Sequence, residues 1–151
     1  MSKVIIEKGT IDDLEEIVSL NYQIFKGMYE NDPYSLAQYR NKLKDKNPII
    51  FISKVAGKII SNSISFEKDD SLYIWILGVA KESREKGIGN LLLGASENFA
   101  KDAGFNSLTV KVYGMSQEMQ ELLKWRNYQV KSIEKNDSNS KYDILHFELE
   151  I

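Results

Sequence analysis

Cysteine is absent from the 151 residues, and histidine occurs once, at His146. Without cysteine the chain can form no disulfide, no thiolate nucleophile, and no zinc or iron–sulfur site held by protein sulfur. A Ser-His-Asp triad could use only His146, and no G-x-S-x-G elbow accompanies it. No other residue of a ligand type is spaced with this histidine as a metal site requires. We therefore expect no metal, and we interpret His146 as structural or exposed.

Long apolar runs and a charge of one sign are also lacking. The longest apolar runs are a few residues, far short of the ~20 that span a bilayer, and the N-terminus has no signal-peptide apolar core. Lys plus Arg number 20 and Asp plus Glu 22, so the formal net charge is −2. That balance gives no overall attraction to nucleic acid or to an anionic membrane. These features predict a cytoplasmic protein without a nucleic-acid or membrane partner.

Length and patterning predict one α/β domain over residues 1–151. The composition, 42% hydrophobic and 28% charged, is that of an ordinary globular protein, and no repeat or linker divides the chain. Short turns join the strands between residues 49 and 79, so these should form an antiparallel meander. Helices are expected to begin near Thr10, Ser35, Ile88 and Ser116. The expected strands cover residues 4–7, 49–55, 58–66, 72–79, 108–112, 128–133 and 145–151.

The hydrophobic period changes from two to about 3.6 after Ala80. Apolar residues from Ile88 to Phe99 then line a helix between the strands over 72–79 and 108–112. A helix of this length permits a right-handed crossover, so the two strands should be parallel. The predicted architecture is a mixed, mostly antiparallel sheet with a central parallel pair and flanking helices.

One segment carries chemistry. A strand and a short polar turn lead into R-x-x-G-x-G, formed by Arg84, Gly87 and Gly89, at the start of an amphipathic helix. The first N–H groups of a helix lack internal partners and carry the positive end of its dipole. The two glycines leave room for a phosphate to approach the backbone, and Arg84 and Lys86 add cationic donors. In this position the pattern predicts an anion site rather than only a tight turn.

Two common phosphate-binding motifs do not fit this segment. A dinucleotide-binding fingerprint needs a third glycine where Leu92 stands, and its strand would not lie within a meander. A P-loop needs Gly-Lys-Ser/Thr after the glycines, and the sequence has none.

The segment resembles the GNAT N-acetyltransferase superfamily, whose acyl-coenzyme A signature is [Arg/Gln]-x-x-Gly-x-[Gly/Ala]. The likeness covers essentially the whole chain. It includes the strand ending Leu77-Gly78-Val79, the signature Arg84–Gly89, the helix end Ala103-Gly104-Phe105 and the step from Leu122 to Tyr128. The resemblance implies a GNAT-type fold whose central parallel pair is splayed for acyl-CoA.

The resemblance also implies acetyl-CoA as co-substrate. Pantetheine would pair with the backbone of Leu77 and Val79, beside the strand over 106–112, and the pyrophosphate would lie on the amides of residues 86–90. The thioester carbonyl would be polarised by an N–H near Val79, and Ser116 matches an asparagine that contacts the cofactor in the family. The cofactor-binding residues are thus expected to be Leu77, Gly78, Val79, Arg84, Glu85, Lys86, Gly87, Ile88, Gly89, Asn90 and Ser116.

The residues that would handle protons depart from the family pattern. The two places at which members carry a glutamate base hold Tyr73 and Lys111, and the usual acidic tyrosine is replaced by Leu123. Asn127 and Tyr128 occupy the positions at which the family usually has Gly and Phe. Tyr113 is the nearest aromatic hydroxyl in sequence and is our candidate acid, the alternative being that it only packs against the following loop.

The acceptor side is less sharply indicated. Tyr29, Glu30 and Asp32 lie in the loop between the first two helices, which in the family lines the acceptor side, although an ordinary solvated loop would look the same. Tyr29 and Tyr73 are the candidate substrate-binding residues. We expect no single buried glutamate to act as base; Glu30 and Glu67 are the nearest carboxylates considered, and solvent could suffice.

The predicted function is an acetyl-CoA-dependent N-acetyltransferase that transfers an acetyl group to a primary amine by direct attack. The alternative is a non-catalytic GNAT-fold sensor or interaction module that binds acyl-CoA, which the missing glutamate and tyrosine favour. The acceptor would be a small amine or a protein amine, and no residue selects between them. The oligomeric state, a homodimer included, stays open.

Overall fold

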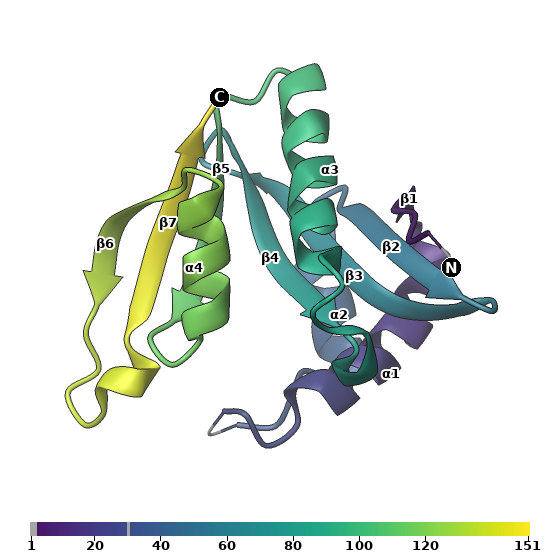
Figure 1. Ribbon diagram of the computed structural model, residues 1–151, viewed down its shortest axis with the longest axis horizontal. Coiled ribbons are helices and arrows are strands. Elements are labelled where there is room, and N and C mark those ends of the chain that lie inside the picture. Colours follow the sequence, from purple (N-terminus) through teal and green to yellow (C-terminus); the bar gives the residue numbers. More distant parts are fainter. Residues whose placement is uncertain (1–2, 30) are drawn as a thin grey trace. The chain divides into compact units, whose positions relative to one another are not determined.

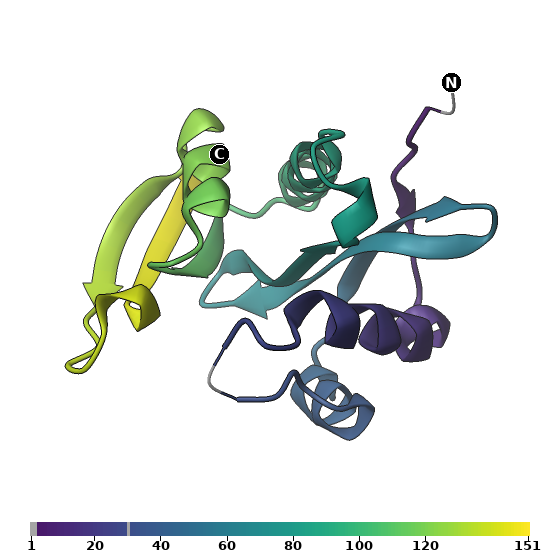
Figure 2. The same cartoon turned by 60° about the horizontal axis from the view of Figure 1, so that its bottom comes forward.

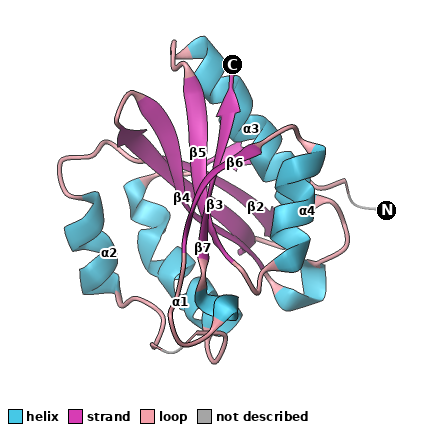
Figure 3. Ribbon diagram, turned by 90° about the vertical axis from the view of Figure 1, so that its left-hand side faces the viewer, coloured by secondary structure: helices cyan, strands magenta, loops and turns pink. Residues whose placement is uncertain are grey.

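The computed structural model describes residues 3–29 and 31–151 (Figure 1). Figure 3 distinguishes the helices, strands and loops of these residues by colour. The helices are α1 (Leu14–Phe25), α2 (Leu36–Leu43), α3 (Ile88–Asp102) and α4 (Gln117–Trp125), with 3-10 turns η1 (Ile11–Asp13), η2 (Lys81–Ser83) and η3 (Ser140–Tyr142). The strands are β1 (Glu7–Lys8), β2 (Ile49–Val55), β3 (Lys58–Lys68), β4 (Ser71–Val79), β5 (Ser107–Tyr113), β6 (Gln129–Glu134) and β7 (Ile144–Glu150).

The strands of the described residues follow the order β1-β2-β3-β4-β5-β7-β6. Strands β4 and β5 are parallel, and their recorded pairing sets Leu72–Ile74 against Leu108–Val110. The pairs β1–β2, β2–β3, β5–β7 and β6–β7 are antiparallel. The predicted mixed sheet, mostly antiparallel with one parallel pair and flanked by helices, is confirmed.

Local sequence explains where the helices begin. The Thr10 hydroxyl accepts from the Asp12 N–H, and the Asp13 carboxylate accepts from the Thr10 N–H. Ser35 and Gln38 exchange the same kind of bonds at the start of α2. These capping boxes satisfy N–H groups that the first helical turn leaves unpaired.

The first strand is shorter and later than predicted. Residues 4–7 were expected to form it, but only Glu7 and Lys8 pair with β2. Val4 and Ile6 instead pack, partly buried, against a core cluster. Val4 and Ile6 flank the exposed Ile5, so one side of this segment packs against the core without a hydrogen-bonded ladder, and the sequence pattern alone does not distinguish such packing from a strand.

The chain groups into two compact units by its contacts. The first spans Met1–Phe66 and Ile76–Ser96, and the second Glu67–Trp75 and Glu97–Ile151. In the first unit, α1 and α2 lie on one face of β2 and β3 and the start of α3 lies on the other (Figure 2). The single domain expected over residues 1–151 stays a prediction.

The second unit holds a buried ion pair. Glu97 of α3 is 9% exposed and receives two bonds from Arg126, Nε to Oε2 at 2.8 Å and Nη2 to Oε1 at 2.6 Å. Tyr128 donates its hydroxyl to Oε2 at 3.1 Å. Burial, followed by the Glu97 carboxylate, raises the pKa of Tyr128 far above its ordinary value, so the phenol stays protonated as the donor.

Glu97→Gln is expected to lower the free energy of unfolding by about 3 kcal/mol, because it leaves the Arg126 guanidinium without its charge partner. This is the lower end for a buried pair, since the Arg126 side chain keeps 19% of its surface exposed. Urea unfolding measures the change. Glu7→Gln removes the exposed Lys54–Glu7 pair and should cost well under about 1 kcal/mol. Equal losses in the two variants would contradict a stabilising role for the buried pair.

Candidate functional site

The predicted anion-binding segment forms a loop over residues 84–87, which we call the phosphate loop, followed by the first residues of α3. It follows β4 and the short turn η2. The Ala80 N–H donates to the Ile60 carbonyl at 2.8 Å, and the Ser83 N–H donates to the Ala80 carbonyl at 2.9 Å. Ala80 and Ser83 are buried. The exposed loop therefore starts from a fixed base in the first unit.

The backbone of the phosphate loop contains residues with both negative and positive φ. Arg84 has a φ of −68°, Glu85 of 68° and Gly87 of 74°. Left-handed residues in a turn of this kind can direct backbone N–H groups toward one side, which suits an anion. Glu85 is an ordinary residue in the left-handed region, a conformation that costs energy and clusters at functional sites. A Cβ at Gly87 would meet nothing within 4 Å, so its glycine serves the backbone conformation and keeps the site open.

Helix α3 begins directly at this loop. Its first helical bond runs from the Leu91 N–H to the Gly87 carbonyl at 3.1 Å. Ile88 and Leu92 are buried in a cluster with Ile60 and Ala80 and so fix the start of the helix. The preceding N–H groups belong to the unpaired first turn, at the positive end of the helix dipole. This arrangement can hold an anion.

Cationic side chains surround the same loop. Arg84 and Lys86 are exposed, and Arg84 Nε donates to the Val79 carbonyl at 3.4 Å. Lys81 adds a third cation on η2, against Glu82 and Glu85. The side-chain charge is therefore weakly positive, and the backbone supplies the more specific part of the anion site.

At the end of β4, Gly78 faces α1, and its two neighbours lie on the opposite face. Leu77 and Val79 pack against the core cluster that contains Ile88. A Cβ on Gly78 would lie 2.9 Å from Asn21 Oδ1 and 3.2 Å from Ile24 Cδ1. Glycine is therefore required here because α1 lies directly against the strand.

Asn21 interrupts the apolar stripe of α1 and is 1% exposed. It donates from Nδ2 to Tyr39 Oη and to Asn62 Oδ1, both at 3.1 Å, and accepts from Asn62 Nδ2 at 2.7 Å. Burial raises the pKa of Tyr39, which keeps its hydroxyl neutral. The buried amides satisfy each other, and they hold α1, α2 and β3 together beside Gly78.

The second unit contains the other predicted cofactor and acid residues. Tyr113 ends β5, and its ring meets Tyr142 edge-on with centroids 6.4 Å apart. Ser116 precedes α4 as predicted, but its hydroxyl makes no capping bond to the described backbone. Gln120 instead donates to the carbonyls of Tyr113 at 3.0 Å and Gly114 at 2.9 Å. The sequence did not indicate Gln120, whose side chain provides hydrogen-bond donors for the carbonyl groups at the end of β5.

The positions that lack the family's carboxylates lie together. Tyr73 is 8% exposed, with Lys68 Nζ 5.0 Å and Lys111 Nζ 5.8 Å from its ring centroid. Leu123 is fully buried. Glu67, considered as a solvent-linked base, is exposed.

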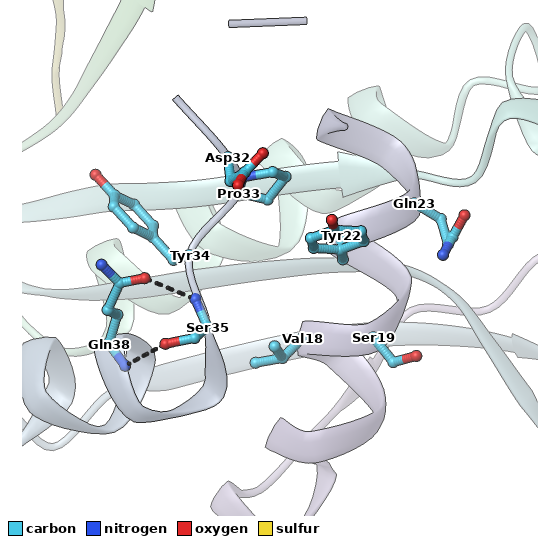
Figure 4. A pocket seen from close by; sticks show the side chains of 9 residues that line it. All are labelled: Val18, Ser19, Tyr22, Gln23, Asp32, Pro33, Tyr34, Ser35 and Gln38. Atoms are coloured by element: carbon cyan, nitrogen blue, oxygen red, sulfur yellow. Dashed lines mark hydrogen bonds between the residues drawn. The ribbon is translucent and has the colours of Figure 1, made fainter. Parts of the chain in front are cut away.

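The loop between α1 and α2 borders a hollow of about 530 Å³ (Figure 4). Tyr29, half-buried, stacks obliquely on Phe25 at 6.2 Å and does not line it. Glu30 lies outside the described residues. Among the lining residues, the sequence indicated Asp32. It did not indicate Tyr22 and Tyr34, which belong to no motif. The lining residues are Val18, Ser19, Tyr22, Gln23, Asp32, Pro33, Tyr34, Ser35 and Gln38.

Two structural features bear on the remaining predictions. Across residues 3–29 and 31–151, no group of three or more His, Asp or Glu side chains is arranged to hold a metal ion. Each helix in that part of the chain is too short or too polar to cross a bilayer.

Comparison with known proteins gives a family. The family model "Acetyltransferase (GNAT) family" matches residues 11–128. No curated protein sequence matches the chain.

Solved structures share the fold at low identity. The ribosomal-protein-S18-alanine N-acetyltransferase from Escherichia coli is 16% identical with a TM-score of 0.83, covering 99% of this chain and 94% of its own. A Bacillus subtilis acetyltransferase in complex with CoA is 13% identical with a TM-score of 0.74, covering 99% of each chain. A GNAT family acetyltransferase from Elizabethkingia anophelis with acetyl-CoA bound is 15% identical with a TM-score of 0.72, covering 100% of each chain. Since the family model spans well over half of the sequence, the chain belongs to the GNAT acetyltransferase family.

Proposed function

We propose that this chain is an acetyl-CoA-dependent N-acetyltransferase that transfers an acetyl group to a primary amine by direct attack. The observation that carries the proposal is the phosphate loop, where Glu85 and Gly87 take left-handed conformations immediately before α3. A turn with unpaired N–H groups at a helix N-terminus is suited to a pyrophosphate. Relatives of the same fold hold CoA or acetyl-CoA, which supports this ligand.

The proposed cofactor contacts come mainly from the phosphate loop and β4. The backbone N–H groups of residues 86–90 hold the pyrophosphate, with Arg84 and Lys86 as cationic donors. Leu77, Gly78 and Val79 offer the backbone of β4 to pantetheine, as an added strand would. Ser116 is a further contact to the cofactor. No metal takes part.

The chemistry needs few side chains. An N–H near Val79 polarises the thioester carbonyl, and the neutral amine forms the new C–N bond as the C–S bond breaks. The departing thiolate takes a proton, for which Tyr113 is the proposed donor, and the proton that the amine nitrogen loses as the amide forms returns to Tyr113 through water. Direct attack needs no nucleophile from the protein, which suits a chain without cysteine.

The acceptor is a small amine or a protein amine. The Escherichia coli relative is named for its substrate, an alanine of ribosomal protein S18. At 16% identity that relation supports the fold and leaves both acceptor classes open here. Tyr29 and Tyr73 are proposed on the acceptor side.

The test has two parts. Calorimetry with acetyl-CoA measures binding, and a panel of amino acids, polyamines and peptide N-termini is screened for release of free CoA thiol. Binding with amine-dependent thiol release is the expected result. Absence of acetyl-CoA binding would refute the proposal.

Arg84→Ala is expected to weaken acetyl-CoA binding by about 1.5–3 kcal/mol, roughly 10- to 150-fold, the usual scale of a hydrogen bond to a charged group. Titration calorimetry measures the change. Lys101→Ala, on the last turn of α3, is the matched control and should leave the affinity unchanged. Equal affinity in the wild type and Arg84→Ala would remove Arg84 from the site.

A specific observation favours a second candidate, a non-catalytic module that binds acyl-CoA. Leu123, fully buried, stands where the family has its tyrosine, and Tyr73 and Lys111 stand where it has glutamates. Such a module would bind acetyl-CoA with the same loop and release no thiol with any amine of the panel.

A further inference from the structure

One face of the sheet in the second unit carries a row of polar side chains that the proposed function does not yet use. Tyr73 lies on β4, Lys111 on β5, His146 on β7 and Glu134 on β6. The opposite face of β5 carries Leu108, Val110 and Val112, all buried. The row therefore lies on the face opposite this part of the core, where Lys111 and Glu134 are exposed.

Strand register places the members next to one another. Lys111 is the direct partner of His146 across β5 and β7, and Ser132 is the partner of His146 across β6 and β7. Directly opposite residues project from the same face. His146 Nε2 and Glu134 Oε1 are 3.1 Å apart, and Lys111 Nζ is 5.8 Å from the Tyr73 ring centroid.

His146 is the only histidine of the chain, and its side chain is 27% exposed. The charged groups that face it are Glu134 from β6, Lys111 from β5, and Glu148 two residues further along β7. Within the described residues Glu134 is its one hydrogen-bond partner, through Nε2. With Nε2 held by a carboxylate, Nδ1 is left for another group.

Two of the tyrosines assigned to the reaction, Tyr73 and Tyr113, lie on this face. Tyr73 pairs directly with Thr109, and Thr109, Lys111 and Tyr113 follow at a spacing of two along β5, whose pairing with β7 has no register shift. An acceptor amine held between the proposed substrate residue Tyr73 and the proposed acid Tyr113 therefore meets the face that carries His146.

We propose that His146, oriented by Glu134, is the base that prepares the acceptor for attack, an inference that rests on the proposed function. An acceptor ammonium N–H bond breaks and its proton moves to Nδ1, while the electron pair stays on nitrogen. The neutral amine then attacks the thioester carbon, and the imidazolium returns its proton to water. An imidazole can take up a proton on one ring nitrogen while a carboxylate on the other ring nitrogen fixes the tautomer that accepts.

The test compares His146→Ala with the wild type on an amine found by the thiol-release screen. We expect kcat/KM at pH 7 to fall about 100-fold, the lower range for loss of a general base, with unchanged acetyl-CoA affinity by calorimetry. Added imidazole should restore a measurable part of the rate, which it would not do for a purely structural residue. Glu134→Gln should lower the rate by a smaller factor.

The control is Glu150→Gln, which removes the Lys131–Glu150 contact between the same two strands. It should keep the wild-type rate. A wild-type rate in His146→Ala, or a low rate that imidazole does not restore, overturns the assignment of the base and leaves the proposed acetyltransferase intact. A wild type that binds no acetyl-CoA overturns both.

Discussion

Gly87→Glu is expected to abolish acetyl-CoA binding, with a loss of affinity of more than about 100-fold. The substitution puts a carboxylate into the open space above the phosphate loop, where the pyrophosphate is proposed to lie. Juxtaposed like charges cost several kcal/mol at an interface, and about 3 kcal/mol already corresponds to roughly 100-fold. Titration calorimetry with acetyl-CoA measures the effect directly.

A matched control exists in the turn between β2 and β3. Gly57 has a φ of 78°, close to the 74° of Gly87, and a Cβ at either glycine would meet nothing within 4 Å. Gly57→Glu therefore imposes the same left-handed strain of about 1–2 kcal/mol and the same added charge, away from the loop. It should lower thermal stability as Gly87→Glu does and leave acetyl-CoA affinity unchanged. Unchanged affinity in Gly87→Glu as well would refute the assignment of the phosphate loop.

The phosphate loop shows how far the sequence predicts the site. Gly87 and Gly89 indicated it, because two glycines between a strand and the start of a helix are typical of a phosphate-binding turn. The left-handed conformation of Glu85 was not predictable, because a non-glycine residue enters that region only when its surroundings force it. Here the chain is held before the loop by Ala80 and Ser83 and after it by buried Ile88.

The buried polar contacts of Asn21 and Glu97 show a second limit of prediction from the sequence. Asn21 was visible as a break in an apolar stripe, but its partner Asn62 is 41 residues away on another element. Glu97 lies on α3, and no sequence pattern pairs it with Arg126, which lies 29 residues further along the chain. Helices and strands follow from local periods and caps, whereas such pairings depend on the tertiary fold. The same holds for His146, interpreted from sequence as structural or exposed and found beside Glu134.

Tyr113→Phe is expected to lower kcat about 100-fold with little change in acetyl-CoA affinity, the usual scale for losing general acid catalysis. The phenolic hydroxyl is proposed to protonate the departing thiolate, and phenylalanine keeps the ring while removing that donor. Leu123, at the place of the family's tyrosine, has no hydroxyl and is fully buried. Single-turnover kinetics with acetyl-CoA bound in advance separates this chemical step from binding and product release.

Tyr142→Phe provides the control for packing. The two rings meet at 6.4 Å and 85°, an edge-to-face contact that each phenylalanine variant preserves. If Tyr113 only packs against the loop of Tyr142, both variants should behave alike, with kcat near that of the wild type. If Tyr113 is the acid, only its own variant loses activity, and the loss should shrink with an acyl donor whose thiol leaves readily as the anion, because such a leaving group has less need of a proton. A Tyr113→Phe deficit of the same size for good and poor leaving groups would contradict the acid role even if kcat fell.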